Sequence, residues 1–263
     1  MGRTMKHAPV YFVIVQARYN AILALESYVS QIQEAFRQLG YPDFQAGTIQ
    51  IINMNQSVGG PGSQPPVSLV QSPRYTFHDI SRTTGFVLEQ ASLSLQTTSY
   101  GDFEQFSALF LNGLSIVDKI AKLAFTERIG YRYLDAIIPD NGKELTHYVS
   151  GFVTGMFGKV DGNISHTFTE SLVVANDVSV TARTIVHDGQ IGFPPDLMGM
   201  PLALPERLTG ISTTHAILDT DGSWTARDAF SIDGVRSRLI SIHAELKRAF
   251  EAIVTPAAVE EWR

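Results

Sequence analysis

The pattern of hydrophobic and polar positions predicts alternating strands and helices in the first half of the chain. Residues 10–19 are apolar on both alternating sets until Gln16 and Arg18, which is typical of a strand buried on both faces. In residues 24–39, apolar side chains recur every three or four positions, and a glycine then a proline end this amphipathic helix. Further along, the pattern predicts strands at 75–81 and 84–96, a long helix from Phe103 capped by Asp102, and a strand at 128–138.

The second half is predicted to contain a hairpin and one long helix. Residues 164–174 and 178–187 alternate as two strands around an Ala-Asn-Asp turn. Residues 213–219 predict a short strand closed by the turn residues Asp221-Gly222, and 235–254 carry a single apolar stripe. The remaining expected segments are a loop rich in glycine and proline at 57–73, a helix at 143–157 and a last helical turn starting at Thr255-Pro256.

Both halves therefore combine antiparallel strands with a long helix, which predicts the α+β class. We expect two β/α units, residues 1–140 and 141–263, with mainly antiparallel sheets packed against long amphipathic helices. No polar linker separates the halves, so the two units should pack together as one globular body.

Composition narrows the class of protein. With 44% hydrophobic and 17% charged residues in 263, the chain can bury a large core. The absence of cysteine excludes disulfides, thiolate metal sites and a cysteine nucleophile. A net charge of −6 without a run of basic residues argues against nucleic-acid binding. The apolar stretch near the N-terminus is too short to cross a bilayer, so we expect a cytoplasmic protein with no membrane partner.

Short segments along nearly the whole chain resemble a sporadically distributed family of uncharacterised prokaryotic proteins of about this length. The most specific is the strand Arg128-Ile129-Gly130-Tyr131-Arg132-Tyr133. The family has no established activity, so the resemblance implies a shared fold and no mechanism. Its scattered occurrence is similar to that of genes carried with mobile or defence islands, which implies a partner encoded in the same operon. The other matching segments are His7–Val10, Ala17–Tyr19, Leu39–Pro42, Leu95–Tyr100, Leu218–Asp221 and Ile242–Phe250 with Thr255, whereas the loop after Asn55 departs from the family.

The same strand carries the candidate ligand-binding residues. Arg128 and Arg132 lie four positions apart, hence on one face, and Gly130 leaves the space between them open. Two guanidinium groups arranged in this way could hold a phosphate or a carboxylate. The alternative is that they form structural ion pairs with Asp135, Glu127 or carboxylates of the second half. Tyr100, Tyr131 and Tyr133 are expected to line a groove, and Arg18 joins the candidate ligand-binding set.

A weaker cluster lies at the end of the short strand. His215, Asp219 and Asp221 share one face if that strand is straight, which would suit metal binding or acid–base chemistry. Asp-x-Asp-Gly is more commonly an ordinary turn. His243, beside the apolar stripe of its helix, is expected to be packed and hydrogen-bonded. We therefore predict no metal and no cofactor.

Motifs of established enzymes are missing from the sequence. It contains no phosphate loop with its lysine, no Gly-x-Ser-x-Gly and no His-Glu-x-x-His. We expect a non-catalytic binding or interaction protein, an accessory subunit of a prokaryotic defence or mobile-island system. The alternatives are a small-molecule or nucleotide sensor that binds an anion through Arg128 and Arg132, and a metal-assisted hydrolase. A homodimer is expected because Leu111, Ile116 and Leu123 extend the apolar face of the 103–125 helix.

Overall fold

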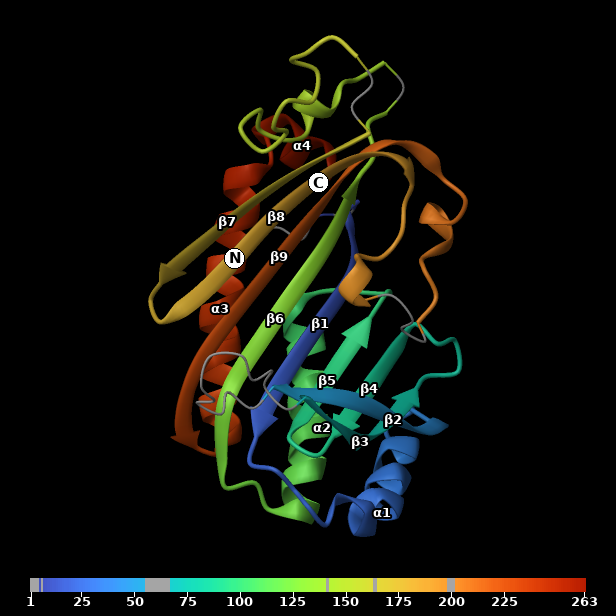
Figure 1. Ribbon diagram of the computed structural model, residues 1–263, viewed down its shortest axis with the longest axis vertical. Coiled ribbons are helices and arrows are strands. Elements are labelled where there is room, and N and C mark those ends of the chain that lie inside the picture. Colours follow the sequence, from blue (N-terminus) through green and yellow to red (C-terminus); the bar gives the residue numbers. More distant parts are fainter. Residues whose placement is uncertain (1–4, 6, 55–66, 141, 163–164, 198–201) are drawn as a thin grey trace.

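Nine strands of the described chain form one antiparallel sheet that runs through the molecule (Figure 1). The computed structural model describes residues 5, 7–54, 67–140, 142–162, 165–197 and 202–263. The strands are β1 (Val10–Tyr19), β2 (Asp43–Met54), β3 (Val67–His78), β4 (Thr84–Glu89), β5 (Ser92–Thr97), β6 (Phe125–Ile137), β7 (His166–Ala175), β8 (Val178–Gln190) and β9 (Ser212–Ala229). Their order across the sheet is β2-β3-β4-β5-β1-β6-β9-β8-β7.

Three long helices cover one face of this sheet. They are α1 (Leu25–Gln38), α2 (Phe103–Ala121) and α3 (Ile232–Ile253), and the short α4 (Pro256–Glu261) follows. In Figure 1, α2 and α3 lie behind the strands. The predicted cap is confirmed, since the Asp102 carboxylate accepts a hydrogen bond from the amide of Gln105 at 2.8 Å. None of the helices in the described ranges is long and apolar enough to cross a bilayer.

The two faces of the sheet are covered differently. Toward the helices, alternate strand residues join buried side chains of α1, α2 and α3 in the largest core. On the opposite face, Ile191, Leu202 and Leu208 of the segment between β8 and β9 pack against Phe12 and Leu134. We call this second side the helix-free face, because none of the α-helices in the described ranges packs on it. Because apolar packing covers only part of it, polar side chains of the central strands can gather there.

The predicted fold class, α+β with two β/α units packed against long helices, is wrong, because the strands of both halves join a single nine-stranded antiparallel sheet with few helices. β6, from the first half, pairs with β1 on one side and with β9 on the other. The strands of the second half therefore extend the first sheet rather than forming their own. The boundary at residue 140 remains a prediction.

Strand β9 shows why the short strand with an Asp-Gly turn was a wrong prediction. The strand continues for 18 residues through Asp221 and Gly222, and from Ala216 to Ser223 it pairs with both β6 and β8. A Cβ atom on Gly222 would lie 2.8 Å from Cγ2 of Ile242. This glycine therefore allows α3 to approach the strand closely and does not form a turn.

Other predicted elements differ from the observed ones at places where the sequence lacks a strong local signal. Residues 143–157 are not the expected helix, because within them only Leu145–His147 form a short 3-10 turn. The expected strand 84–96 is divided into β4 and β5 by a two-residue turn without glycine or proline, and β2 was not predicted. Of the expected loop 57–73, residues 57–66 lie outside the described ranges, and the rest belongs to β3.

The apolar surface that motivated the homodimer is largely used within the chain. Leu111 and Leu123 are buried and Ile116 is half-buried, all in the core that α2 shares with α1 and α3. Helix α2 therefore lacks the spare apolar face expected from its sequence, and self-association needs a different surface.

Candidate functional site

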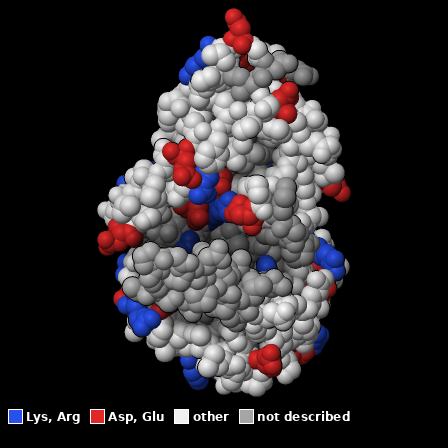
Figure 2. All heavy atoms as spheres, in the orientation of Figure 1, with Lys and Arg blue, Asp and Glu red and all other residues white. Residues whose placement is uncertain are grey.

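The two candidate arginines of β6 lie on the helix-free face, as their spacing predicts. From Arg128 onward, the even-numbered β6 residues point to this face, and charged side chains gather at its hollowed centre (Figure 2). A Cβ atom on Gly130 would lie 2.6 Å from Nη1 of Arg128. The Arg128 guanidinium therefore occupies the space that the missing side chain leaves, which explains why glycine stands between the two arginines.

Arg132 is held by carboxylates of the same chain. Its Nε and Nη2 donate to the two oxygens of Asp219 at 2.7 and 2.8 Å, and Nη1 donates to Asp196. The Arg132 and Asp219 side chains are 11% and 2% exposed. Arg183 adds a second cation 3.3 Å from Asp219. Arg132 thus forms a buried ion pair with a carboxylate of the second half, which is the structural alternative stated from the sequence. These contacts already occupy its Nε, Nη1 and Nη2 atoms.

Arg128 is held much more loosely. Its Nη1 donates to Gln16 at 3.4 Å, and its Nη2 lies 3.9 Å from the nearest oxygen of Asp221. Glu127 and Asp135, the other expected partners, are not used: Glu127 pairs with Arg227, and Asp135 points to the helix side. Among the described residues, no carboxylate lies within hydrogen-bond distance of the Arg128 guanidinium.

Arg18 lies next to Arg128 on the helix-free face. The two residues are direct cross-strand partners in the β1–β6 pairing. Arg18 is exposed, and among the described residues it takes part in no ion pair. Like charges opposite one another on neighbouring strands repel. Arg18 and Arg128 are thus neighbours in the sheet register, whereas Arg132 is already paired. The Arg128 guanidinium itself lies over Gly130, close to Gln16 and Asp221.

The weak metal candidates are separated along β9. His215, Asp219 and Asp221 do share the helix-free face, but the first two are four residues apart, or about 13 Å along a strand. His215 Nδ1 contacts the Thr213 carbonyl at 2.8 Å. Burial raises the pKa of Asp221, although Arg128 opposes this effect. In the described ranges, no three His, Cys, Asp or Glu side chains are grouped closely enough to hold a metal ion.

Tyr131 and Tyr133 lie on the other side of the sheet, away from the arginines. They stack with ring centroids 4.9 Å apart, facing the helices. The Tyr133 hydroxyl hydrogen-bonds to Tyr100 at 3.1 Å and to Nδ1 of His243 at 3.0 Å. His243 is thus packed and hydrogen-bonded, as predicted. Burial raises the pKa of Tyr133 well above its usual value and lowers that of His243, so both are neutral near pH 7.

Tyr100, Tyr133 and His243 line a pocket together with Asp135, which the sequence suggested only as an ion-pair partner of the arginines. Asp135 lies two residues after Tyr133 on the same side of β6 and is 5% exposed. Burial raises its pKa to about 7, with Arg207 acting in the opposite direction. Strand alternation was the signal that could have separated Tyr131, Tyr133 and Asp135 from the two arginines.

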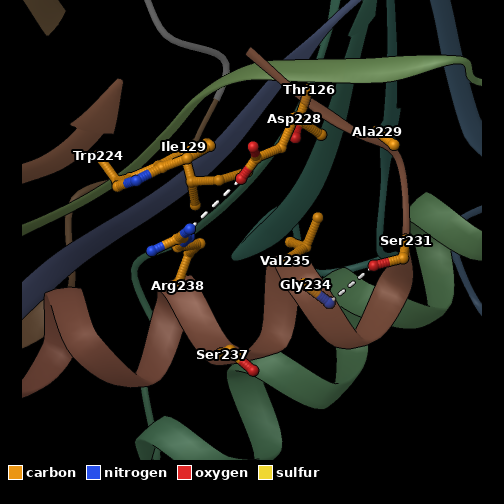
Figure 3. Close-up of a pocket in the computed structure, with 10 residues that line it drawn as sticks. All are labelled: Thr126, Ile129, Trp224, Asp228, Ala229, Ser231, Gly234, Val235, Ser237 and Arg238. Atoms are coloured by element: carbon orange, nitrogen blue, oxygen red, sulfur yellow. Dashed lines mark hydrogen bonds and ion pairs between the residues drawn. The ribbon is translucent and has the colours of Figure 1, made fainter. Parts of the chain in front are cut away.

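A further groove lies where α3 begins (Figure 3). Arg238 packs over the Trp224 ring at 4.4 Å and lies 3.3 Å from an oxygen of Asp228. The Ser231 hydroxyl accepts a hydrogen bond from the Gly234 amide and caps the helix. Because these groups bind one another, the groove offers little to a ligand.

No family model matches the chain, and no curated protein matches its sequence.

Proposed function

We propose that this protein is a non-catalytic binding protein that holds a small anionic molecule between Arg18 and Arg128 on the helix-free face. The observation that carries the proposal is the direct cross-strand pairing of these two arginines. A phosphate or carboxylate would relieve their mutual repulsion and accept several N–H groups.

The neighbouring residues support such a site. Gln16 positions Arg128 from one side, and its own amide donates to Ser94 at 3.1 Å. Gly130 gives the guanidinium room to lie against the sheet. A nucleotide or another small phosphorylated molecule is the ligand class we propose, in place of an anion held by Arg128 and Arg132.

We expect phosphate-bearing ligands to stabilise the wild-type protein and to lose this effect in Arg18→Ala and Arg128→Ala. At a hundred times its dissociation constant, a ligand adds about 2.7 kcal/mol of stability. Thermal unfolding against inorganic phosphate and a nucleotide panel measures the shift. Arg37→Ala is the matched control, because Arg37 is an exposed arginine of α1 paired with Glu34. An unchanged shift in both site variants would contradict the proposal.

Self-association is part of the same proposal, with β7 as the interface. In the described sheet, β7 pairs only with β8, so its outer edge presents unpaired backbone groups. Phe168, Leu172 and Val174 are more than half exposed on this strand. Two copies related by a two-fold axis would pair their β7 strands antiparallel and continue the sheet.

We expect a dimeric mass by light scattering at micromolar concentrations, and a monomeric mass for Leu172→Lys. The lysine would place like charges near each other across the new strand pair. Leu23→Lys is the control, because Leu23 is 84% exposed but lies outside the sheet. A wild-type monomer at all concentrations would exclude this interface.

An accessory role in a prokaryotic defence or mobile-island system, with an operon-encoded partner in the cytoplasm, completes the proposal. It is supported by the absence of a catalytic motif in the sequence and by the resemblance of segments such as Arg128–Tyr133. Co-purification of the tagged protein with the products of neighbouring genes tests it.

A further inference from the structure

A pocket of about 340 Å³ opens on the helix side, between the start of α2, strand β6 and the second half of α3. This volume lies within the usual range for small-molecule sites. Aromatic rings form part of its wall, beside aliphatic and charged side chains. The rings that line it belong to Tyr100, Phe103, Tyr133, His243 and Phe250.

Asp135 is the buried charge of this pocket. Only 5% of the Asp135 surface is exposed. Even so, no side chain within the described residues donates a hydrogen bond to its carboxylate. Arg207 is the nearby cation, but its Nη2 donates to the Val10 carbonyl at 2.7 Å and the Pro9 carbonyl at 3.4 Å. A buried carboxylate without donors is costly, and a ligand that supplied N–H groups would remove that cost.

The walls are fixed before any ligand arrives. The hydroxyls of Tyr100 and Tyr133 and Nδ1 of His243 form a continuous hydrogen-bonded chain. Phe103 stacks on His243 with centroids 4.1 Å apart and planes within 10°. A rigid aromatic wall loses little conformational freedom when it binds a ligand.

The charges around the opening favour a cation. Asp102 and Glu104 lie at the start of α2 and line the pocket together with Asp135. Lys247 is the lining cation, and it is exposed and lies 3.8 Å from Glu251. His243 is neutral because burial lowers its pKa. Three carboxylates therefore face Lys247, whose charge is already partly balanced, and Arg207, which lies near Asp135 but donates to the backbone carbonyls of Pro9 and Val10.

We infer that this pocket binds a small organic amine, with its ammonium group on Asp135 and an apolar body about the size of one ring against the aromatic wall. The ammonium would donate to the buried carboxylate, and neighbouring aromatic faces attract a cation. This ligand has the opposite charge from the proposed anion and lies on the opposite face of the sheet. The inference therefore does not depend on the Arg18–Arg128 site.

Three probes of one shape test the charge requirement in the wild-type protein. Calorimetric titration at about pH 8, where Asp135 is ionised, compares 2-phenylethylamine, 2-phenylethanol and phenylacetate. We expect the amine to bind at least about tenfold more tightly than the alcohol, and the acid to bind most weakly. Equal affinity for amine and alcohol, or no saturable amine binding up to about 10 mM, would overturn the inference.

The variant Asp135→Asn assigns the effect to one carboxylate. We expect amine and alcohol affinities to become equal within about threefold, because the amide keeps the shape and removes the charge. Asp228→Asn is the matched control, since Asp228 is an exposed carboxylate far along the neighbouring strand. Circular dichroism checks that both variants are folded. Amine preference that survives in Asp135→Asn would refute the assignment, and the wild-type comparison tests the inference even if this variant does not fold.

Discussion

Replacing Arg132 with alanine is expected to lower the free energy of unfolding by about 3 kcal/mol. The substitution leaves the Asp219 carboxylate, only 2% exposed, without its two short hydrogen bonds. Breaking a buried ion pair by removing one partner generally costs 3–5 kcal/mol, because the remaining charge stays desolvated. Arg183, 3.3 Å away, compensates in part and places the expected loss at the lower end. Urea unfolding followed by circular dichroism measures it.

Arg128→Ala is the matched control for this prediction. It changes the same residue type on the same strand and the same face, four positions earlier. Its side chain is 30% exposed and its nearest carboxylate is 3.9 Å away, so the expected loss is below about 1 kcal/mol. Equal losses in the two variants would contradict the distinction between a structural Arg132 and an available Arg128.

That distinction depends on partners that the sequence could not identify. The spacing of Arg128, Gly130 and Arg132 correctly predicts that they share one face of a strand, because alternation is a local property. The partner of Arg132 lies 87 residues away on β9, and that pairing exists only because β9 lies beside β6. Long-range register of this kind leaves no local pattern.

Local rules were reliable where local forces dominate. The first strand, the apolar stripes of α1 and α3, and the Asp102 cap are all confirmed. They fail at Asp219–Gly222, where aspartate and glycine favour a turn in isolation. Pairing with β6 and β8 on both sides and the close approach of α3 keep this segment extended. Tertiary contacts thus override turn propensity at the point where the buried ion pair forms.

The candidate sites also combine features that follow from local sequence with features that depend on tertiary contacts. Alternation separates the arginines from Tyr131, Tyr133 and Asp135, so two sites on opposite faces could have been predicted from the strand alone. The contact that completes the wall of the Asp135 pocket could not have been predicted in this way, because His243 comes from α3, 110 residues after Tyr133. The pairing of Arg18 with Arg128 likewise requires the order of β1 and β6 in the sheet.

Asp135 should make stability depend on pH in a direction opposite to that of ordinary surface carboxylates. Burial raises its pKa from 3.8 to about 7 in the folded protein. Between these values the folded chain holds a proton that the unfolded chain has released, so stability falls as the pH rises. The histidines His78 and His243, whose pKa values burial lowers, act in the opposite sense in part of this range. The wild-type curve alone therefore does not isolate the aspartate.

The variant Asp135→Asn isolates the contribution of this aspartate to the pH dependence of stability, because the amide cannot ionise and leaves the other groups in place. We expect the variant and the wild type to be about equally stable near pH 4, and the variant to gain steadily until about pH 7. One pKa unit corresponds to about 1.4 kcal/mol, so the full gain is at most about 4 kcal/mol. This bound already includes Arg207, which stabilises the ionised form from the segment before β9; Glu104 and Lys247 face the same pocket with opposite charges. Urea unfolding of both proteins from about pH 4 to about pH 8 gives the difference curve. A flat curve would mean that Asp135 is solvated or already paired, and it would remove the buried charge on which the amine pocket depends.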